Sequence, residues 1–175
     1  MLMGMRGARH RFMPNRLVFP GGRVDPTDHK APFATDLPAE TRALLERTAP
    51  PRLAQGLALA AARELEEETG LSLGAPPELD GLHYLCRAVT PPSQHMRFNA
   101  RFLVVDAERV TGTLAGSGEL EELRWYDMDE AMAFDLAGIT RDVVRNLQAF
   151  LAMDEAARRA RTAIPINRFN RWGME

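Results

Sequence analysis

The chain has 175 residues, of which 45% are hydrophobic and 26% are charged, and its formal net charge at pH 7 is −2. This length suits one domain with its own core, and the small negative charge argues against a nucleic-acid surface built on positive potential. The single cysteine, Cys86, excludes a disulfide framework. No segment approaches the roughly 20 apolar residues of a membrane helix and no signal peptide is evident, so we expect a cytoplasmic protein.

The first predicted element is an apolar strand at residues 1–6, and a basic patch follows it. The patch consists of Arg6, Arg9, His10 and Arg11. A solvated loop and a surface that contacts the phosphates of a substrate are both compatible with this patch.

A short apolar segment at residues 16–19 predicts a buried strand that ends at a pair of glycines. Paired glycines allow a sharp turn and a close approach of the backbone to a ligand. The loop therefore supplies three candidate substrate-binding residues: Gly21, Gly22 and Arg23. Asp25 and Asp28 follow, and either could add an outer ligand to a metal cluster.

The next two elements are predicted to be helices. Helical spacing of Thr41, Leu44 and Leu45 predicts a short helix that begins near Asp36 and is stopped by the proline pair at residues 50–51. The alanine-rich stretch 53–69 predicts a longer helix that can pack closely on a sheet.

This longer helix carries the most informative pattern in the chain. Glu64, Glu67 and Glu68 stand at positions i, i+3 and i+4, so their carboxylates should converge on one face, whereas Glu66 points elsewhere. Three neighbouring carboxylates repel one another unless protons or cations intervene, and hard oxygen ligands suit Mg²⁺ or Mn²⁺. The alternative is a solvated acidic face, which is common on helices.

Two strands are predicted after this helix. Residues 82–89 are apolar and β-branched and contain Cys86, while His83 is expected on the strand surface. Residues 97–105 alternate in polarity. Their polar face, with Arg97 and Arg101, is a candidate for binding a substrate phosphate or base.

The C-terminal third begins with a charged segment, residues 119–126, that includes Glu119 and Glu122 and enters a predicted strand. A strongly amphipathic helix around residues 143–151 should cover the sheet. The tail, residues 156–175, is arginine-rich, and its last part, residues 165–175, is expected to be disordered or to dock on a partner.

The acidic helix resembles the second half of the Nudix box, the signature of the Nudix hydrolases. The matching positions are Arg63, Glu64, Leu65, Glu67, Glu68, Gly70 and Leu71. The first half resembles residues 19–28, with Gly22 as its glycine and Asp28 where the family usually has glutamate. Gly22 and Arg63 lie 41 positions apart, so the box is split by 27 extra residues, 29–55. This insertion is expected to be a specificity lid or a solvent-side decoration.

The resemblance implies a single α/β domain over residues 1–175, with a mixed sheet sandwiched between helices. It also implies hydrolysis of a nucleoside diphosphate linked to another group X, with Mg²⁺ or Mn²⁺ as cofactor. The implied metal ligands are Glu64, Glu67, Glu68 and Gly22. Arg63 would orient the glutamates, and the general base could be Glu64, Glu67, Glu119 or Glu122.

The family usually has one more strand ahead of residues 1–6. We therefore expect the start to be truncated relative to relatives, or another element or a partner chain to fill that sheet position, which favours a homodimer. The nearest branch resembles the peroxisomal coenzyme A diphosphatases, although the elements linked to coenzyme A recognition are not evident. Coenzyme A, its acyl derivatives, ADP-ribose and NADH are the candidate substrates.

Two other classes of protein fit the sequence. Some Nudix domains sense nucleotides without turnover, usually after losing acids of the box, and here Glu64, Glu67 and Glu68 are all present. A purely structural α/β domain with an acidic helix predicts no thermal stabilisation by Mg²⁺. Melting with Mg²⁺ and with EDTA tests that alternative.

Overall fold

The computed structural model describes residues 1–7 and 14–175, and the candidate residue Arg9 lies outside the described residues. Its largest sheet has four strands in the order β5-β4-β8-β9. These are β4 (His83–Val89), β5 (Asn99–Val104), β8 (Pro165–Arg168) and β9 (Arg171–Met174). β8 runs parallel to β4 and the other neighbours are antiparallel, so the sheet is mixed, as predicted.

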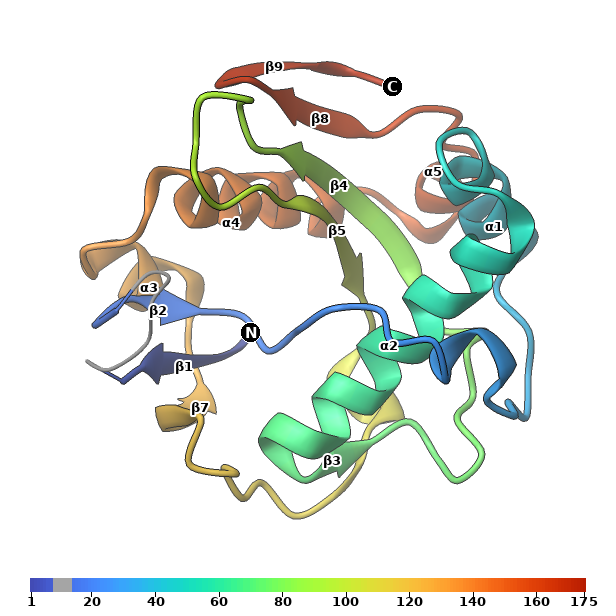
Figure 1. Ribbon diagram of the computed structural model, residues 1–175, viewed down its shortest axis with the longest axis horizontal. Helices are drawn as coiled ribbons and strands as arrows, with labels where there is room; N and C mark the ends of the chain where they lie inside the picture. The colour runs from blue at the N-terminus through green and yellow to red at the C-terminus, as the bar shows by residue number, and fades with distance from the viewer. Residues whose placement is uncertain (8–13) are drawn as a thin grey trace.

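Helices cover both faces of this sheet (Figure 1). α1 (Ala39–Glu46) and α2 (Pro51–Thr69) cover one face, and α4 (Gly138–Leu151) covers the other. The apolar residues of α4 recur every three or four positions, so Val143, Leu147 and Phe150 pack on Leu85 and Cys86 of β4. The predicted α/β architecture is confirmed. Among the described residues, no helix is both long and apolar enough to cross a membrane.

A second sheet lies beside the first and has the order β2-β1-β7. Its strands are β1 (Leu2–Arg6), β2 (Leu17–Val18) and β7 (Leu120–Trp125), and α3 (Met128–Ala133) packs against them. β3 (Leu71–Ser72) and β6 (Thr111–Gly112) form a third, two-stranded sheet. The expectation of one sheet was wrong. β1 pairs with β2 along one edge and with β7 along the other, so it has no free edge that could pair with β4. The remaining short helices are η1 (Asp28–Lys30), η2 (Ala107–Arg109) and α5 (Glu155–Arg159).

α2 is bounded by the residue types that suit its two ends. Pro51 occupies the first turn, where its missing N–H leaves no hydrogen bond unmade. Gly70 ends the helix with a left-handed φ of 71°, and its N–H donates to the carbonyl of Glu66 over 2.9 Å. The helix starts two residues before the predicted boundary because the proline pair begins it. This end places the glutamates at the last turns of α2.

α1 forms where the sequence predicted a helix, but it belongs to the core. Leu44 and Leu45 are 5% and 0% exposed, and they pack in one cluster with α2 and Tyr84 of β4. The Thr41 hydroxyl donates to the carbonyl of Leu82 over 2.8 Å. The apolar face of α1 is therefore part of the core, and a role of the insertion as a specificity lid or a solvent-side decoration stays a prediction.

This packing predicts a large cost for shortening Leu45. Leu45→Ala should lower the free energy of unfolding by about 2–5 kcal/mol, because it removes buried methyl groups and leaves a cavity. Leu151→Ala is the control, because Leu151 is 41% exposed and a surface truncation costs little. Urea denaturation measures both variants, and a loss similar to that of Leu151→Ala would contradict a core role for α1.

The tail is also ordered, contrary to the expectation of disorder or partner docking. Residues 165–174 form the β8–β9 hairpin, and β8 pairs with β4 through the register Arg87–Ile166 to Val89–Arg168. Ile164 and Ile166 are buried, which supplies the apolar contact that holds the hairpin on the sheet. β8 of the same chain therefore fills the sheet position beside β4. An empty position was the reason for expecting a partner chain, and that reason does not apply beside β4.

Candidate active site

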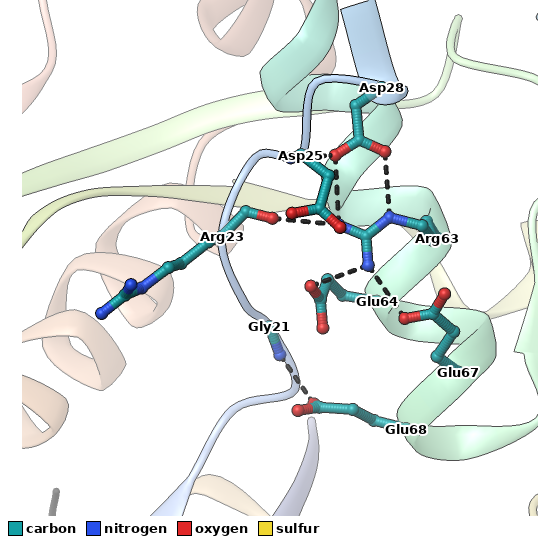
Figure 2. Close-up of polar contacts among 8 residues, drawn as sticks. All are labelled: Gly21, Arg23, Asp25, Asp28, Arg63, Glu64, Glu67 and Glu68. Atoms are coloured by element: carbon teal, nitrogen blue, oxygen red, sulfur yellow. Dashed lines mark hydrogen bonds and ion pairs between the residues drawn. The ribbon is translucent and has the colours of Figure 1, made fainter. Parts of the chain in front are cut away.

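The glycine loop after β2 passes close to the last turns of α2 (Figure 2). Gly22 lies so near Glu64 that an added Cβ would collide with the Glu64 carboxylate. Gly21 has a φ of 150°, in the region that favours glycine. The loop needs Gly22 for its close approach to Glu64 and Gly21 for its backbone conformation.

Arg63 is the centre of the polar network between this loop and α2. Its Nε and Nη2 atoms donate to the two carboxylate oxygens of Asp28 over 2.9 and 3.1 Å. Its Nη1 atom donates to Glu64 over 2.9 Å and to Glu67 over 2.8 Å. Nη2 also reaches the carbonyl of Arg23 over 2.9 Å. One guanidinium therefore fixes the loop and two of the three glutamates together (Figure 2).

Asp28 positions Arg63 and is not placed as an outer metal ligand. Its side chain is 2% exposed, both of its oxygens bind Arg63, and it also accepts from the Asp25 N–H over 2.7 Å. Burial opposes its ionisation, but the hydrogen bonds from Arg63 and Asp25 outweigh burial and hold the pKa of Asp28 below its usual value. The expectation of a ligand was wrong, because these partners leave no free oxygen facing the glutamates.

Glu68 is the buried member of the three glutamates. It is 3% exposed, and its Oε2 accepts a hydrogen bond of 2.8 Å from the backbone N–H of Gly21. Burial, with repulsion from Glu119 and Glu64, raises the pKa of Glu68 to about 7 even though the Gly21 bond opposes the shift. Glu119 and Glu64 therefore both act electrostatically on Glu68 at this end of α2.

The three carboxylates share one side of α2 but do not meet in one cluster. Glu64 and Glu67 turn toward Arg63, while Glu68 turns toward Gly21 (Figure 2). Among residues 1–7 and 14–175, no three acidic, histidine or cysteine side chains converge closely enough to hold a metal ion. The predicted convergence was wrong in this detail, because like charges separate and each carboxylate takes a nearby donor.

The family assignment rests on the sequence of the whole domain. The NUDIX domain matches residues 1–147, which is most of the chain. The chain belongs to the Nudix family. It is a Nudix-type hydrolase, and this family hydrolyses nucleoside diphosphates linked to another moiety.

Comparison with solved structures agrees at the level of the fold. The crystal structure of a NUDIX hydrolase from Alicyclobacillus acidocaldarius is similar with a TM-score of 0.63 and 23% sequence identity. The similarity covers 85% of this chain and 82% of that one. No curated protein matches the chain in sequence. The Nudix assignment therefore gives the fold and the reaction class, and the substrate is a separate question.

The donor set of this Nudix site fits a hard divalent cation. Glu64, Glu67 and Glu68 supply carboxylate oxygens, and the backbone of Gly22 lies against the Glu64 carboxylate. Burial raises the pKa of Glu68, and repulsion from Glu119 and Glu64 adds to the shift, so a cation beside these acids would favour the ionised form. Glu67 is the most accessible of the three, with 59% of its side chain exposed. To share one ion, the carboxylates must give up some of their present partners.

The two secondary acids of the late strand have different surroundings. Glu119 acts electrostatically on Glu68, which places it at the edge of the site. Glu122 has a φ of 49° and an exposed side chain, and its carbonyl accepts from the Tyr126 hydroxyl over 3.0 Å. The structure therefore brings Glu119, and not Glu122, toward the glutamates of the Nudix box.

The predicted substrate-binding arginines are spread over the molecule. The Arg23 side chain is exposed and points away from Arg63 (Figure 2). Arg97 is exposed ahead of β5. Arg101 is half-buried and donates to the carbonyl of Thr48 over 3.2 Å, near the start of α2 and away from the glutamates. Only Arg23 lies beside the Nudix box, and substrate contacts for all three stay predictions.

Sequence reasoning missed two contributors to the site. One is the Gly21 N–H, which holds Glu68; no side-chain pattern signals a backbone donor. The other is Arg6 at the end of β1, whose positive charge lowers the pKa of Glu68. Its place in the basic patch was noted, but only the β1–β7 pairing of Arg6 with Leu120 brings it close to the acids.

Proposed function

We propose that this protein uses Mg²⁺ or Mn²⁺ to cleave the diphosphate linkage of a nucleoside diphosphate joined to another moiety. The observation that carries the proposal is the Arg63 network, which holds Glu64 and Glu67 beside Gly22 while Glu68 and Glu119 add negative charge nearby. A nucleoside diphosphate is itself anionic, so this acidic end can accept it only with cations between the two.

The residues divide into three roles. Glu64, Glu67, Glu68 and the Gly22 carbonyl would hold the cation, which neutralises the diphosphate and lowers the pKa of a water molecule. Arg63, itself held by Asp28, orients Glu64 and Glu67. Glu119 is the candidate to take the proton of the attacking water, because it lies near Glu68, and Glu64 is the alternative.

The substrate class rests on the resemblance and on the exposed basic groups. Coenzyme A or an acyl derivative is our first candidate, and ADP-ribose and NADH are its rivals. Arg23, exposed beside the glycine pair, is placed to contact a phosphate. Arg9 and Arg97 are further candidates for the same role.

The direct test is product detection by mass spectrometry after incubation with Mg²⁺ or Mn²⁺. The substrates are coenzyme A, ADP-ribose, NADH and nucleoside triphosphates, each supplied separately. We expect cleavage of one class at its diphosphate, and Glu67→Gln should lower kcat/KM at least about tenfold. Glu66→Gln is the matched control, because Glu66 lies on the same helix turn with an exposed side chain. Equal activity of both variants would remove Glu67 from the site.

A nucleotide-sensing role is the second candidate, and one observation favours it. The three carboxylates are not gathered around one point among the described residues. A sensor would bind ADP-ribose or coenzyme A in calorimetry, with metal present, and would release no product. Turnover that requires metal and is lost in Glu67→Gln would eliminate this candidate.

We propose further that the protein acts in the cytoplasm and that any homodimer forms through the outer edge of β9. In the described part of the chain β9 pairs only with β8, so its other edge is free for a second copy. Light scattering after size-exclusion chromatography distinguishes a monomer from a dimer.

A further inference from the structure

A group of charged side chains lies away from the Nudix box, on the β5-β4-β8-β9 sheet and at the residue that follows β9. Arg87 is 8% exposed, and its Nη1 binds both carboxylate oxygens of Glu175 over 2.7 and 2.9 Å. Its Nε donates to the Asn99 side chain over 2.7 Å. Arg168 reaches the same Glu175 carboxylate over 3.1 Å. We call Arg87, Arg101, Arg168 and Glu175 the distal cluster.

Arg101 is the member of the distal cluster that forms no salt bridge among the described residues. Its Nη2 donates to the carbonyl and hydroxyl of Thr48 over 3.2 and 3.5 Å. Among residues 1–7 and 14–175, no carboxylate pairs with Arg101, and its buried Nε has no hydrogen-bond partner. Burial, together with repulsion from Arg87, lowers the pKa of Arg101, although Tyr84 and Glu175 oppose the shift. A half-buried cation beside a second cation is costly unless an anion is near.

The charge balance of the distal cluster therefore points to an anion. Three guanidinium groups face one carboxylate, that of Glu175, so the cluster carries more positive than negative charge. The register of β4 and β5 pairs Arg101 with Arg87, and a purely structural role for Arg101, binding the Thr48 carbonyl, explains its Nη2 but not its free Nε. Guanidinium groups bind phosphate and carboxylate through several parallel hydrogen bonds.

We propose that Arg87 and Arg101 form an anion-binding site for a phosphate or carboxylate group, in which the Glu175 side chain is a displaceable internal ligand. Rotation of this side chain alone would open the site, because the Glu175 backbone is held separately by two 3.0 Å hydrogen bonds to Ile164. The Glu175 side chain is 16% exposed and its second partner, Arg168, is 56% exposed, so the ligand can enter from solvent on this side. A phosphate offers more acceptor oxygens than a carboxylate and can also engage the Arg101 Nε.

The position of the site allows two sources for the anion. Arg101 contacts Thr48, just before α2, whereas Glu64 lies 13 residues along α2 from Pro51, which is roughly 20 Å. The anion is therefore not the diphosphate under attack. It is either a second anionic group on a long substrate or a separate phosphate, and the first source rests on the proposed function.

The test uses inorganic phosphate as the probe and the full chain in EDTA, so that the Nudix box takes no part. Phosphate affinity is measured by calorimetry at constant ionic strength. We expect Glu175→Gln to bind phosphate at least about tenfold more tightly than the wild type, because it removes the competing negative charge. Adding Arg101→Gln to Glu175→Gln should abolish this gain. Adding Arg171→Gln is the matched control, since Arg171 is an exposed arginine of β9.

Two results would overturn the proposal. One is equal phosphate affinity of the wild type and Glu175→Gln, both shown to be folded by circular dichroism. The other is an equal loss of phosphate affinity when Arg171→Gln or Arg101→Gln is added to Glu175→Gln. That result would mean a general effect of surface charge. If Arg101→Gln does not fold, Arg101→Lys replaces it, and it should lose most of the gain because lysine lacks the planar fork.

A second measurement separates the two sources. For a substrate with an additional phosphate, Glu175→Gln should lower KM, while KM for the same substrate without that phosphate should not change. Phosphate binding without any change in KM assigns the site to a separate anion. Absence of all turnover would contradict the proposed function, whereas the phosphate measurement in EDTA would still decide the anion site.

Discussion

Replacement of Arg63 by alanine should lower the free energy of unfolding by about 3–5 kcal/mol, because it leaves a buried carboxylate without its partner. Asp28 is 2% exposed, and both of its oxygens accept from Arg63. The variant also frees Glu64 and Glu67 from the Nη1 atom that holds them. Activity should therefore fall even at temperatures where the variant is still folded.

Urea denaturation of Arg63→Ala, Asp28→Asn and the double variant measures this coupling. The double variant should be more stable than Arg63→Ala, since the buried charge is gone with its partner. Arg42→Ala is the matched control, because Arg42 forms an exposed ion pair with Asp36 and such pairs contribute little. A cost for Arg63→Ala equal to that for Arg42→Ala would contradict the central role of Arg63.

Glu68→Gln should have opposite effects on activity and on stability. Activity should fall about a hundredfold or more, because the variant removes a buried charge from the proposed metal site. The fold should persist, since the glutamine side-chain oxygen can still accept from the Gly21 N–H. In metal-free protein above pH 7, the variant should be more stable than the wild type.

The sign of this stability difference follows from the pKa of Glu68, which burial raises from 4.5 to about 7. Between these values the folded protein keeps a proton that the unfolded chain releases, so wild-type stability falls as pH rises. The loss is complete above about pH 7 and amounts to at most about 3 kcal/mol. Glu68→Gln lacks this dependence.

Urea denaturation in EDTA from pH 4.5 to 8 measures the difference between the two proteins. Glu66→Gln is the control, because Glu66 is exposed and its substitution should leave the pH dependence unchanged. A constant difference between wild type and Glu68→Gln over this range would show that the Glu68 pKa is close to its ordinary value.

Local sequence patterns predicted helices and strands well where the residues of the element itself determine its conformation. The residue types of β4 and the alternation of β5 reflect burial, and both strands lie within two residues of their predicted bounds. The amphipathic spacing of α4 predicted its end at Leu151, but the helix begins at Gly138, five residues before the predicted stretch. The end of α2 at Gly70 was predictable because only glycine takes a left-handed φ without strain.

The sequence predicted which residues belong to the site, but it did not predict which hydrogen bonds they form. Spacing placed Glu64, Glu67 and Glu68 on one side of a helix, and the family resemblance assigned Gly22 and Asp28 to the same site across 27 intervening residues. Spacing could not tell that Asp28 would be buried against Arg63, or that Glu68 would bind a backbone N–H. Both depend on how the glycine loop crosses α2.

The sequence alone determined the family, the helix that carries the acids and the reaction class, because these depend on residue type and on spacing along one element. The tertiary structure decided which carboxylate is buried, which partner each one takes, and how the strands divide into three sheets. It also placed α1 in the core and the β8–β9 hairpin beside β4. These outcomes depend on packing between segments far apart in the chain, about which local spacing carries no information.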